Sequence, residues 1–124
     1  MPADTIVVHR WNDMPSEAIT PFVSRRFITG DRMTVAQFDL KRDGVVPRHS
    51  HDQEQFTCVL SGRLKFVMNG QEIVAGPGEV VQIPGGVPHE VHVLEDAHVM
   101  DVFSPIRQDW IDKTDDYFKR TSEV

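Results

Sequence analysis

Short apolar segments alternate with glycine- and proline-containing turns through the middle of the chain. The segments are rich in β-branched and aromatic residues, which is typical of β-strands. Strand-like and helix-like segments do not alternate, which disfavours a parallel α/β sheet. The pattern therefore predicts an antiparallel all-β sandwich or barrel, with strands at residues 33–40, 55–60, 63–68, 80–83, 89–93 and 97–103.

Three short polar segments are predicted to connect neighbouring strands. Asn69-Gly70 lies between two strand-like runs and is the sequence signal of a type I′ hairpin. Ser61-Gly62 and Glu95-Asp96 are expected to turn the chain in a similar way. After the last strand, Ser104-Pro105 suits a helix N-cap followed by proline in the first turn. A short helical or irregular segment is expected there, containing Trp110, Ile111, Tyr117 and Phe118.

Composition indicates a single globular domain. The chain has 124 residues, of which 40% are hydrophobic and 26% charged, so it can bury a core without a disulfide or a structural metal. A net charge of −6 without a basic run argues against a nucleic-acid or anionic-membrane partner. We expect one domain over residues 1–124, made of N-terminal strands or an arm (1–30), a barrel (31–103) and a C-terminal segment (104–124).

The sequence contains no feature of a secreted or membrane-bound protein. Cys58 is the only cysteine, so an intrachain disulfide is impossible. The N-terminal residues lack a basic region followed by an apolar one, and no apolar run approaches the ~18 residues of a membrane span. A cytoplasmic location is therefore expected.

Three histidines provide the candidate chemistry. His49, His51 and Gln55 have the same parity, so on a regular strand they project to one side, whereas Glu54 faces away unless a bulge intervenes. Two imidazoles at this spacing suit a metal site. His89 follows a Pro-Gly-Gly turn further along the chain. A histidine pair at a surface is often a coincidence, but the second signal favours a site.

Two motifs in this chain resemble those of the cupin superfamily. The first reads Gly44-x4-His49-x-His51-x3-Gln55-x6-Gly62, and the second reads Gly78-x5-Pro84-x-Gly86-x2-His89. The resemblance implies a small antiparallel double-sheet jelly-roll barrel with a metal site inside. The chain departs from the family pattern in three ways: Gln55 replaces a glutamate, Val93 replaces an asparagine, and the first glycine is one residue closer.

A site of His49, His51, Gln55 and His89 has only neutral ligands. A divalent ion there keeps its full charge, which favours anionic substrate oxygens and Lewis-acid chemistry over oxygen activation. The ligand types do not select one transition metal, so Ni, Fe, Mn, Zn and Co all remain open.

A second segment, Asp101-x-Phe103-x3-Arg107, resembles a narrower group of cupins. These cupins act in pectin and alginate degradation and ketonise 4,5-unsaturated monouronates. Their metal ligands are three histidines and a glutamine, as in the set above. The resemblance implies that Asp101 is a general acid or base and that Phe103 packs on the sugar ring. Arg107 is then expected to bind the substrate carboxylate or to orient Asp101.

Two other classes of function remain open. The same ligands suit a metal-dependent oxygenase, or another isomerase, acting on a small organic acid. The fold also suits a non-catalytic cupin that binds a sugar or metabolite. In that case Asp101 and Arg107 are a structural ion pair, and Phe103 is a core residue.

The outward side of strand 55–60 is apolar, because it carries Phe56, Cys58 and Leu60. A sheet face in contact with water normally shows polar residues, so a cover is expected. The N-terminal segment, with Ile6–Val8 and Trp11, is one candidate. A second subunit is the other, so a homodimer is predicted. His9, His92 and His98 lie outside the motifs and are expected to be exposed or packing residues.

Overall fold

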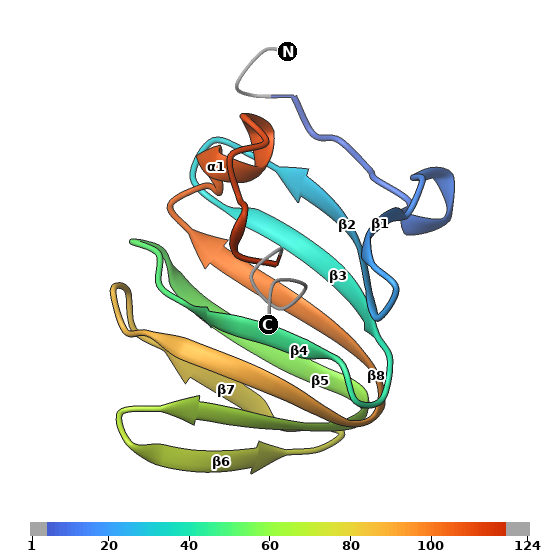
Figure 1. Cartoon of the computed structure of the whole chain (residues 1–124). Helices are drawn as coiled ribbons and strands as arrows, with labels where there is room; N and C mark the ends of the chain where they lie inside the picture. The colour runs from blue at the N-terminus through green and yellow to red at the C-terminus, as the bar shows by residue number, and fades with distance from the viewer. Residues whose placement is uncertain (1–4, 119–124) are drawn as a thin grey trace.

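The computed structural model describes residues 5–118, which form two antiparallel sheets facing each other (Figure 1). A 3-10 turn, η1 (Trp11–Asp13), precedes the strands, and a short helix, α1 (Gln108–Ile111), follows them. The strands are β1 (Glu17–Thr20), β2 (Val23–Thr29), β3 (Thr34–Leu40), β4 (Val45–His49), β5 (Glu54–Met68), β6 (Gln71–Ala75), β7 (Val80–Ile83) and β8 (His89–Ser104).

The long strands β5 and β8 belong to both sheets. The first half of β5 and the second half of β8 pair in one sheet, in the order β1-β2-β3-β8-β5-β7. The second half of β5 and the first half of β8 pair in the second sheet, in the order β4-β8-β5-β6. All of these pairs are antiparallel, so the predicted double-sheet jelly-roll is confirmed.

The predicted turns at Ser61-Gly62 and Glu95-Asp96 are wrong. Both lie within continuous strands, which bend where they cross from one sheet to the other. Gly62 has a φ of 84°, and a Cβ atom there would lie 2.3 Å from the Asp96 carbonyl oxygen. Only glycine therefore lets the two backbones pass this closely. The register shifts around Gly62 insert a bulge rather than a hairpin.

The bulge changes which side chains of β5 face inward. Odd-numbered residues are buried before it and even-numbered residues after it, whereas β8 buries odd-numbered residues on both sides of its exposed residues 94–96. Asp101 and Phe103 therefore share the interior with His89, which the sequence left undecided across residues 95–96. The apolar part of the interior includes Val59, Leu64, Phe66, Val91, Val93 and Val99.

The hairpin at Asn69-Gly70 is confirmed, because β5 and β6 are joined there with φ values of 52° and 72°. The predicted helix start at Ser104-Pro105 is wrong. Ser104 ends β8, and α1 begins only at Gln108. The Arg107 backbone N–H donates a hydrogen bond to Thr34 Oγ1 at 2.9 Å, which attaches the preceding residues to β3 instead of starting a helix.

Two hydrophobic residues of the N-terminal segment do not cover the outer face of the barrel. Ile6 is 94% exposed and Val8 is 73% exposed, so neither side chain is packed. Within residues 5–118, no helix has the length and hydropathy needed to cross a membrane.

Candidate metal centre

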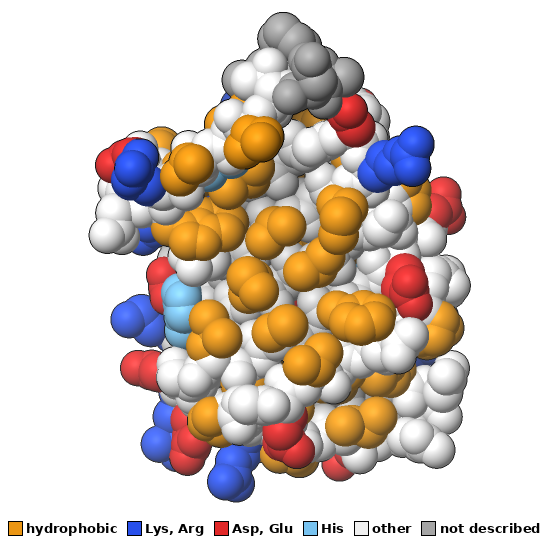
Figure 2. Space-filling model, turned by 180° about the vertical axis from the view of Figure 1, so that it is seen from behind, with side chains coloured by type: hydrophobic (Ala, Val, Ile, Leu, Met, Phe, Trp, Pro, Cys, Tyr) orange, Lys and Arg blue, Asp and Glu red, His pale blue; other side chains and the backbone are white. Residues whose placement is uncertain are grey.

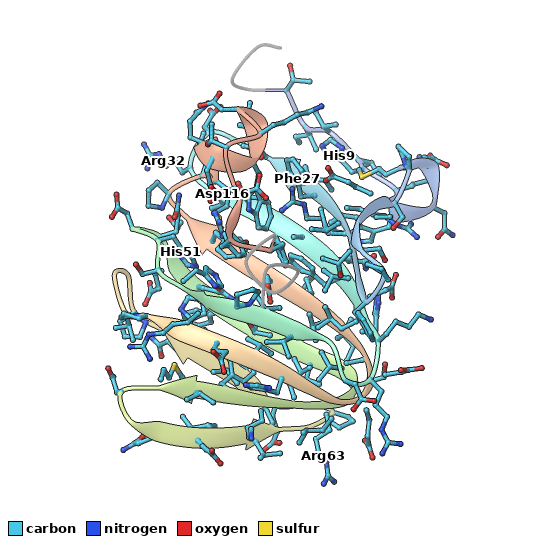
Figure 3. The ribbon with its side chains drawn as sticks, viewed as in Figure 1. His9, Phe27, Arg32, His51, Arg63 and Asp116 are labelled. Atoms are coloured by element: carbon cyan, nitrogen blue, oxygen red, sulfur yellow. The ribbon has the colours of Figure 1, made fainter. Side chains whose placement is uncertain are left out.

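The three histidines come together from three elements at one end of the barrel. His49 is the last residue of β4 and lies opposite His89, the first residue of β8. His51 lies on the loop before β5 (Figure 3). One ligand atom from each imidazole lies within 4.8 Å of those of the other two. His49 and His51 do not share a regular strand, so their convergence depends on the loop rather than on strand parity.

Backbone carbonyls fix the tautomer of each ring. Nδ1 of His49 lies 2.7 Å from the Pro47 oxygen, Nδ1 of His51 lies 3.0 Å from the Gln53 oxygen, and Nδ1 of His89 lies 2.9 Å from the Val87 oxygen. A carbonyl oxygen only accepts, so each Nδ1 carries the proton. Each Nε2 is left with a free lone pair, the form in which histidine binds a metal.

Gln55 adds an oxygen ligand from the first inward position of β5. Its amide N–H donates to Thr57 Oγ1 at 2.9 Å and, more weakly, to Asp101 Oδ2 at 3.4 Å. These bonds point Oε1 toward His51 Nε2, at 3.0 Å. A neutral imidazole has one N–H, so His51 cannot donate to both the Gln53 and the Gln55 oxygen. With the proton on Nδ1, two lone pairs face each other, which is unfavourable unless a cation lies between them.

His89 gives a second indication of a cation. Its Nε2 atom is buried and has no hydrogen-bond partner within the described part of the chain. A buried polar atom without a partner is costly, so it calls for an explanation. The residues present fit a divalent metal: three Nε2 lone pairs and one amide oxygen converge, and no carboxylate is included.

Burial keeps these histidines neutral. Loss of hydration lowers the pKa of His49 to about 3 and that of His51 to about 4, and the positive charges that neighbouring groups carry add to the effect. The pKa of His89 is also lowered, again mainly by burial. At neutral pH all three rings are therefore available as ligands.

Asp101 lies on β8 beside the ligands, with its side chain buried. Burial raises the pKa of its carboxyl to about 7, against the hydrogen bond from Thr57 and the charge of Arg107. Its Oδ1 atom has no hydrogen-bond partner among residues 5–118. A carboxyl with this pKa holds a proton part of the time at neutral pH, so it suits proton transfer. Glu54 faces outward and accepts a hydrogen bond from Gln82, as predicted.

Phe103 and Arg107 lie behind the ligands. The Phe103 ring contacts the His51 ring edge-on, with the centroids 5.6 Å apart. The Arg107 guanidinium lies 4.7 Å from the Phe103 centroid and donates hydrogen bonds to both Asp109 carboxylate oxygens, at 3.0 and 2.8 Å. Arg107 therefore pairs with Asp109, and the ion pair with Asp101 considered above is not formed.

Two residues of the site were not predicted from the sequence. Thr57 orients the Gln55 amide, and its inward parity on the same strand was the available signal. Tyr117 was expected only as part of a helical segment. Its ring stacks on His49 with a centroid distance of 4.0 Å and an interplanar angle of 4°.

The interior cavity beside these residues has a volume of about 50 Å³. Its polar lining comes from the ligands and the predicted catalytic residues, and its apolar lining comes from the barrel core and the C-terminal segment. The residues of the candidate site that line the cavity are His49, Gln55, Thr57, His89, Asp101, Phe103, Arg107 and Tyr117.

The family model described as "Cupin domain" matches residues 36–103, which is more than half of the chain. The chain therefore belongs to the cupin family. An uncharacterized protein of Streptomyces coelicolor, SCO3923, is 31% identical over 81 residues, which span 64% of this chain and 77% of that protein.

Solved structures share the fold. KdgF from Halomonas sp. superposes with a TM-score of 0.76 at 23% identity, covering 82% of this chain and 96% of that one. An RmlC-like cupin from Shewanella frigidimarina gives a TM-score of 0.79 at 19% identity, covering 86% and 96%. These likenesses support the jelly-roll architecture.

Gly85 connects the second motif to the loop that carries His51. A Cβ atom at Gly85 would lie 2.3 Å from the Asp52 carbonyl oxygen, and the neighbouring Gly86 N–H donates to the His51 oxygen at 2.8 Å. Gly85→Ala is therefore expected to displace His51 and weaken divalent-metal affinity about 10- to 100-fold, measured by competition with a chelating dye.

Gly76→Ala is the matched control, because the nearest atom to its added Cβ is Glu79 Oε1 at 3.7 Å. This variant is expected to keep the affinity of the parent protein. Equal affinities for the two alanine variants would show that the contact at Gly85 does not position His51.

Proposed function

We propose that this cupin is a metal-dependent enzyme that opens and ketonises 4,5-unsaturated monouronates derived from pectin or alginate. The observation that carries the proposal is the neutral ligand set beside a buried carboxyl whose pKa is raised to about 7. The resemblance of the Asp101-x-Phe103-x3-Arg107 segment to uronate-ketonising cupins and the fold shared with KdgF support it.

The residues at the centre divide into ligands and a proton donor. His49, His51, Gln55 and His89 would hold the metal, which when bound supplies Lewis-acid polarisation of substrate oxygens. Opening of the ring hemiacetal breaks the bond between carbon 1 and the ring oxygen and leaves an aldehyde and an enol at carbon 5. The protonated Asp101 carboxyl would then donate its proton to carbon 4, and the enol hydroxyl would release its proton to the resulting carboxylate as the ketone forms at carbon 5. The Asp101 proton and the unsaturated carbon must therefore meet on the inner face of β8.

Arg107 is already hydrogen-bonded to Asp109, so fewer of its N–H groups can bind a substrate than in an unpaired guanidinium. Asp109 accepts from Nε and Nη2 of Arg107, a residue that also lines the cavity, so only its remaining N–H groups are available to a ligand. We expect them to bind one oxygen of the substrate carboxylate rather than both. The Phe103 ring packs against this guanidinium and contacts the His51 ring edge-on, so it restricts the position of both.

The direct test is an NMR time course with unsaturated galacturonate and with its alginate-derived counterpart. The absorbance of the conjugated double bond is followed in parallel, with the protein as purified and after treatment with a chelator. We expect conversion to the linear keto acid faster than the protein-free reaction, and loss of that acceleration with the chelator. Conversion at the protein-free rate with both substrates would contradict the proposal.

The outer face of the first sheet is proposed to form a homodimer interface. Hydrophobic side chains gather on one face of the molecule (Figure 2). On this face Phe56 lies across from Val102, and Cys58 lies between Met100 and Val80. A continuous apolar surface of this kind marks an interaction site. With the sequence features above, a soluble dimer in the cytoplasm is the state we propose.

Val80→Glu is expected to convert the dimer to a monomer, because a charge would be buried within the interface. Val74→Glu is the matched control: it changes a valine of similar exposure, 51% against 56%, on β6 of the second sheet. Light scattering coupled to gel filtration measures the mass. A monomeric parent protein at tens of micromolar would contradict the proposed interface.

A further inference from the structure

The C-terminal segment fills the space next to the candidate metal ligands. Tyr117 and Phe118 are buried, and both line the interior cavity. The Tyr117 ring lies parallel to the His49 ring, with the centroids 4.0 Å apart. The Phe118 ring packs against the Tyr117 ring, with the centroids 4.4 Å apart. The cavity that remains is about 50 Å³, whereas pockets for small organic ligands are typically about 300–1,000 Å³.

The hydroxyl of Tyr117 is directed to the predicted anion-binding residue. The charge of the Arg107 guanidinium acts on this oxygen and opposes the burial that raises the pKa of the Tyr117 hydroxyl. Tyr117 thus presents a flat six-membered ring to a ligand histidine and an oxygen substituent to Arg107. A planar unsaturated sugar ring with a carboxylate needs the same two contacts.

We infer that the Tyr117 side chain occupies the position of the substrate ring and mimics it. A planar six-membered ring that carries an anionic group displaces residues 114–118, including Tyr117. The identification of that ring as substrate rests on the proposed function. The displacement itself concerns only the shape and charge of the ligand.

The attachment of this segment allows such displacement. It adds no strand to either sheet, and one ion pair, from Asp115 to Arg25 at 2.9 Å, holds it to β2. The Thr114 N–H also donates to the Asp109 oxygen at 2.9 Å. Residues 112–114 and Asp116 are exposed, and Asp116 lies on the segment that follows α1 (Figure 3). Release of the segment therefore breaks no strand pairing of the barrel.

Benzoate is the probe, because it is a flat ring with a carboxylate and requires no turnover. Its affinity is measured by titration calorimetry on the full-length protein as purified. Asp115→Asn and Tyr117→Ala each remove part of the competing segment, so we expect both to bind benzoate at least about fivefold more tightly. Asp116→Asn removes the same charge from the neighbouring exposed position and is expected to match the parent protein within twofold.

Trypsin cleavage after Lys113, which is exposed in a turn, gives a second measurement. Displacement predicts that benzoate accelerates cleavage after Lys113, followed by mass spectrometry as the appearance of the fragment that ends at Lys113, and that Asp115→Asn is cleaved there faster without ligand. Slower cleavage with benzoate would overturn the inference, since the segment would then close over the ligand. Absent binding, equal affinities in all variants, or weaker binding by Tyr117→Ala would overturn it as well. None of these results depends on uronate turnover, so failure of the proposed function would be seen separately.

Discussion

Asp101→Asn is expected to lower the turnover of an unsaturated monouronate by roughly 10²–10⁴-fold, the usual contribution of a positioned acid or base. Asp101 is the only carboxyl among the described residues that line the cavity. Asparagine keeps the size of the side chain but has no acidic proton to donate. The NMR time course at fixed protein concentration measures the effect, with the metal content determined on the same sample.

Asp39→Asn is the control for this variant, because Asp39 lies on β3 and pairs with His98 at 2.8 Å on the exposed surface. It is expected to retain the parent rate. An Asp101→Asn protein that keeps both its metal and the full rate would rule out proton transfer by this carboxyl. It would favour the alternative in which Asp101 has only a structural role.

His89→Ala is expected to lower divalent-metal affinity by at least about a hundredfold and to remove the metal-dependent rate. Loss of an outer-shell partner alone typically costs 10- to 100-fold, and His89 is itself a ligand candidate. The buried Nε2 of His89 has no hydrogen-bond partner within residues 5–118, so alanine removes a metal-binding lone pair that no described group replaces. Calorimetric titration of the chelator-treated protein measures the affinity.

His92→Ala is the matched control. His92 lies on the same strand but projects outward, where it is hydrogen-bonded to Glu90. We expect this variant to bind metal as the parent protein does. If both alanine variants bound metal equally well, His89 would not be a ligand.

The parts of the site that could be predicted from the sequence depend on local periodicity. Within each half of β8 the odd-numbered residues face inward, so parity placed Asp101 with Phe103 on one face, but it did not connect that face to His89 across residues 95–96. The outward orientation of Glu54 and of Phe56 followed from the same rule. Parity alone does not identify metal ligands, so the family resemblance was needed to assign His49, His51, Gln55 and His89 to one site.

The parts that could not be predicted depend on contacts between distant segments. Ser61-Gly62 has the composition of a hairpin, but its glycine serves the close approach of β5 to Asp96 on β8. The partner of Arg107 is Asp109, which follows it on the connection into α1, rather than Asp101 on the strand. Tyr117 reaches His49 through an irregular segment, and no periodic pattern specifies such a path.

The position of His51 illustrates both cases. Its spacing from His49 is a strand spacing, yet β4 ends at His49 and the two rings converge because the loop bends. The turn around Gly85 and Gly86 supports that bend through the Asp52 and His51 carbonyls. The motif spacing thus predicted that these side chains converge, but they do so for a local reason that differs from strand alternation.

The account depends most on a divalent ion held jointly by His49, His51, Gln55 and His89. Its most direct test is elemental analysis of the protein as purified, combined with calorimetric titration of the chelator-treated protein with Mn, Fe, Co, Ni and Zn. One tightly bound ion per chain, with sub-micromolar affinity for at least one of these metals, is the predicted result. A protein that contains no divalent metal when purified and binds none of the five at tens of micromolar would contradict the account.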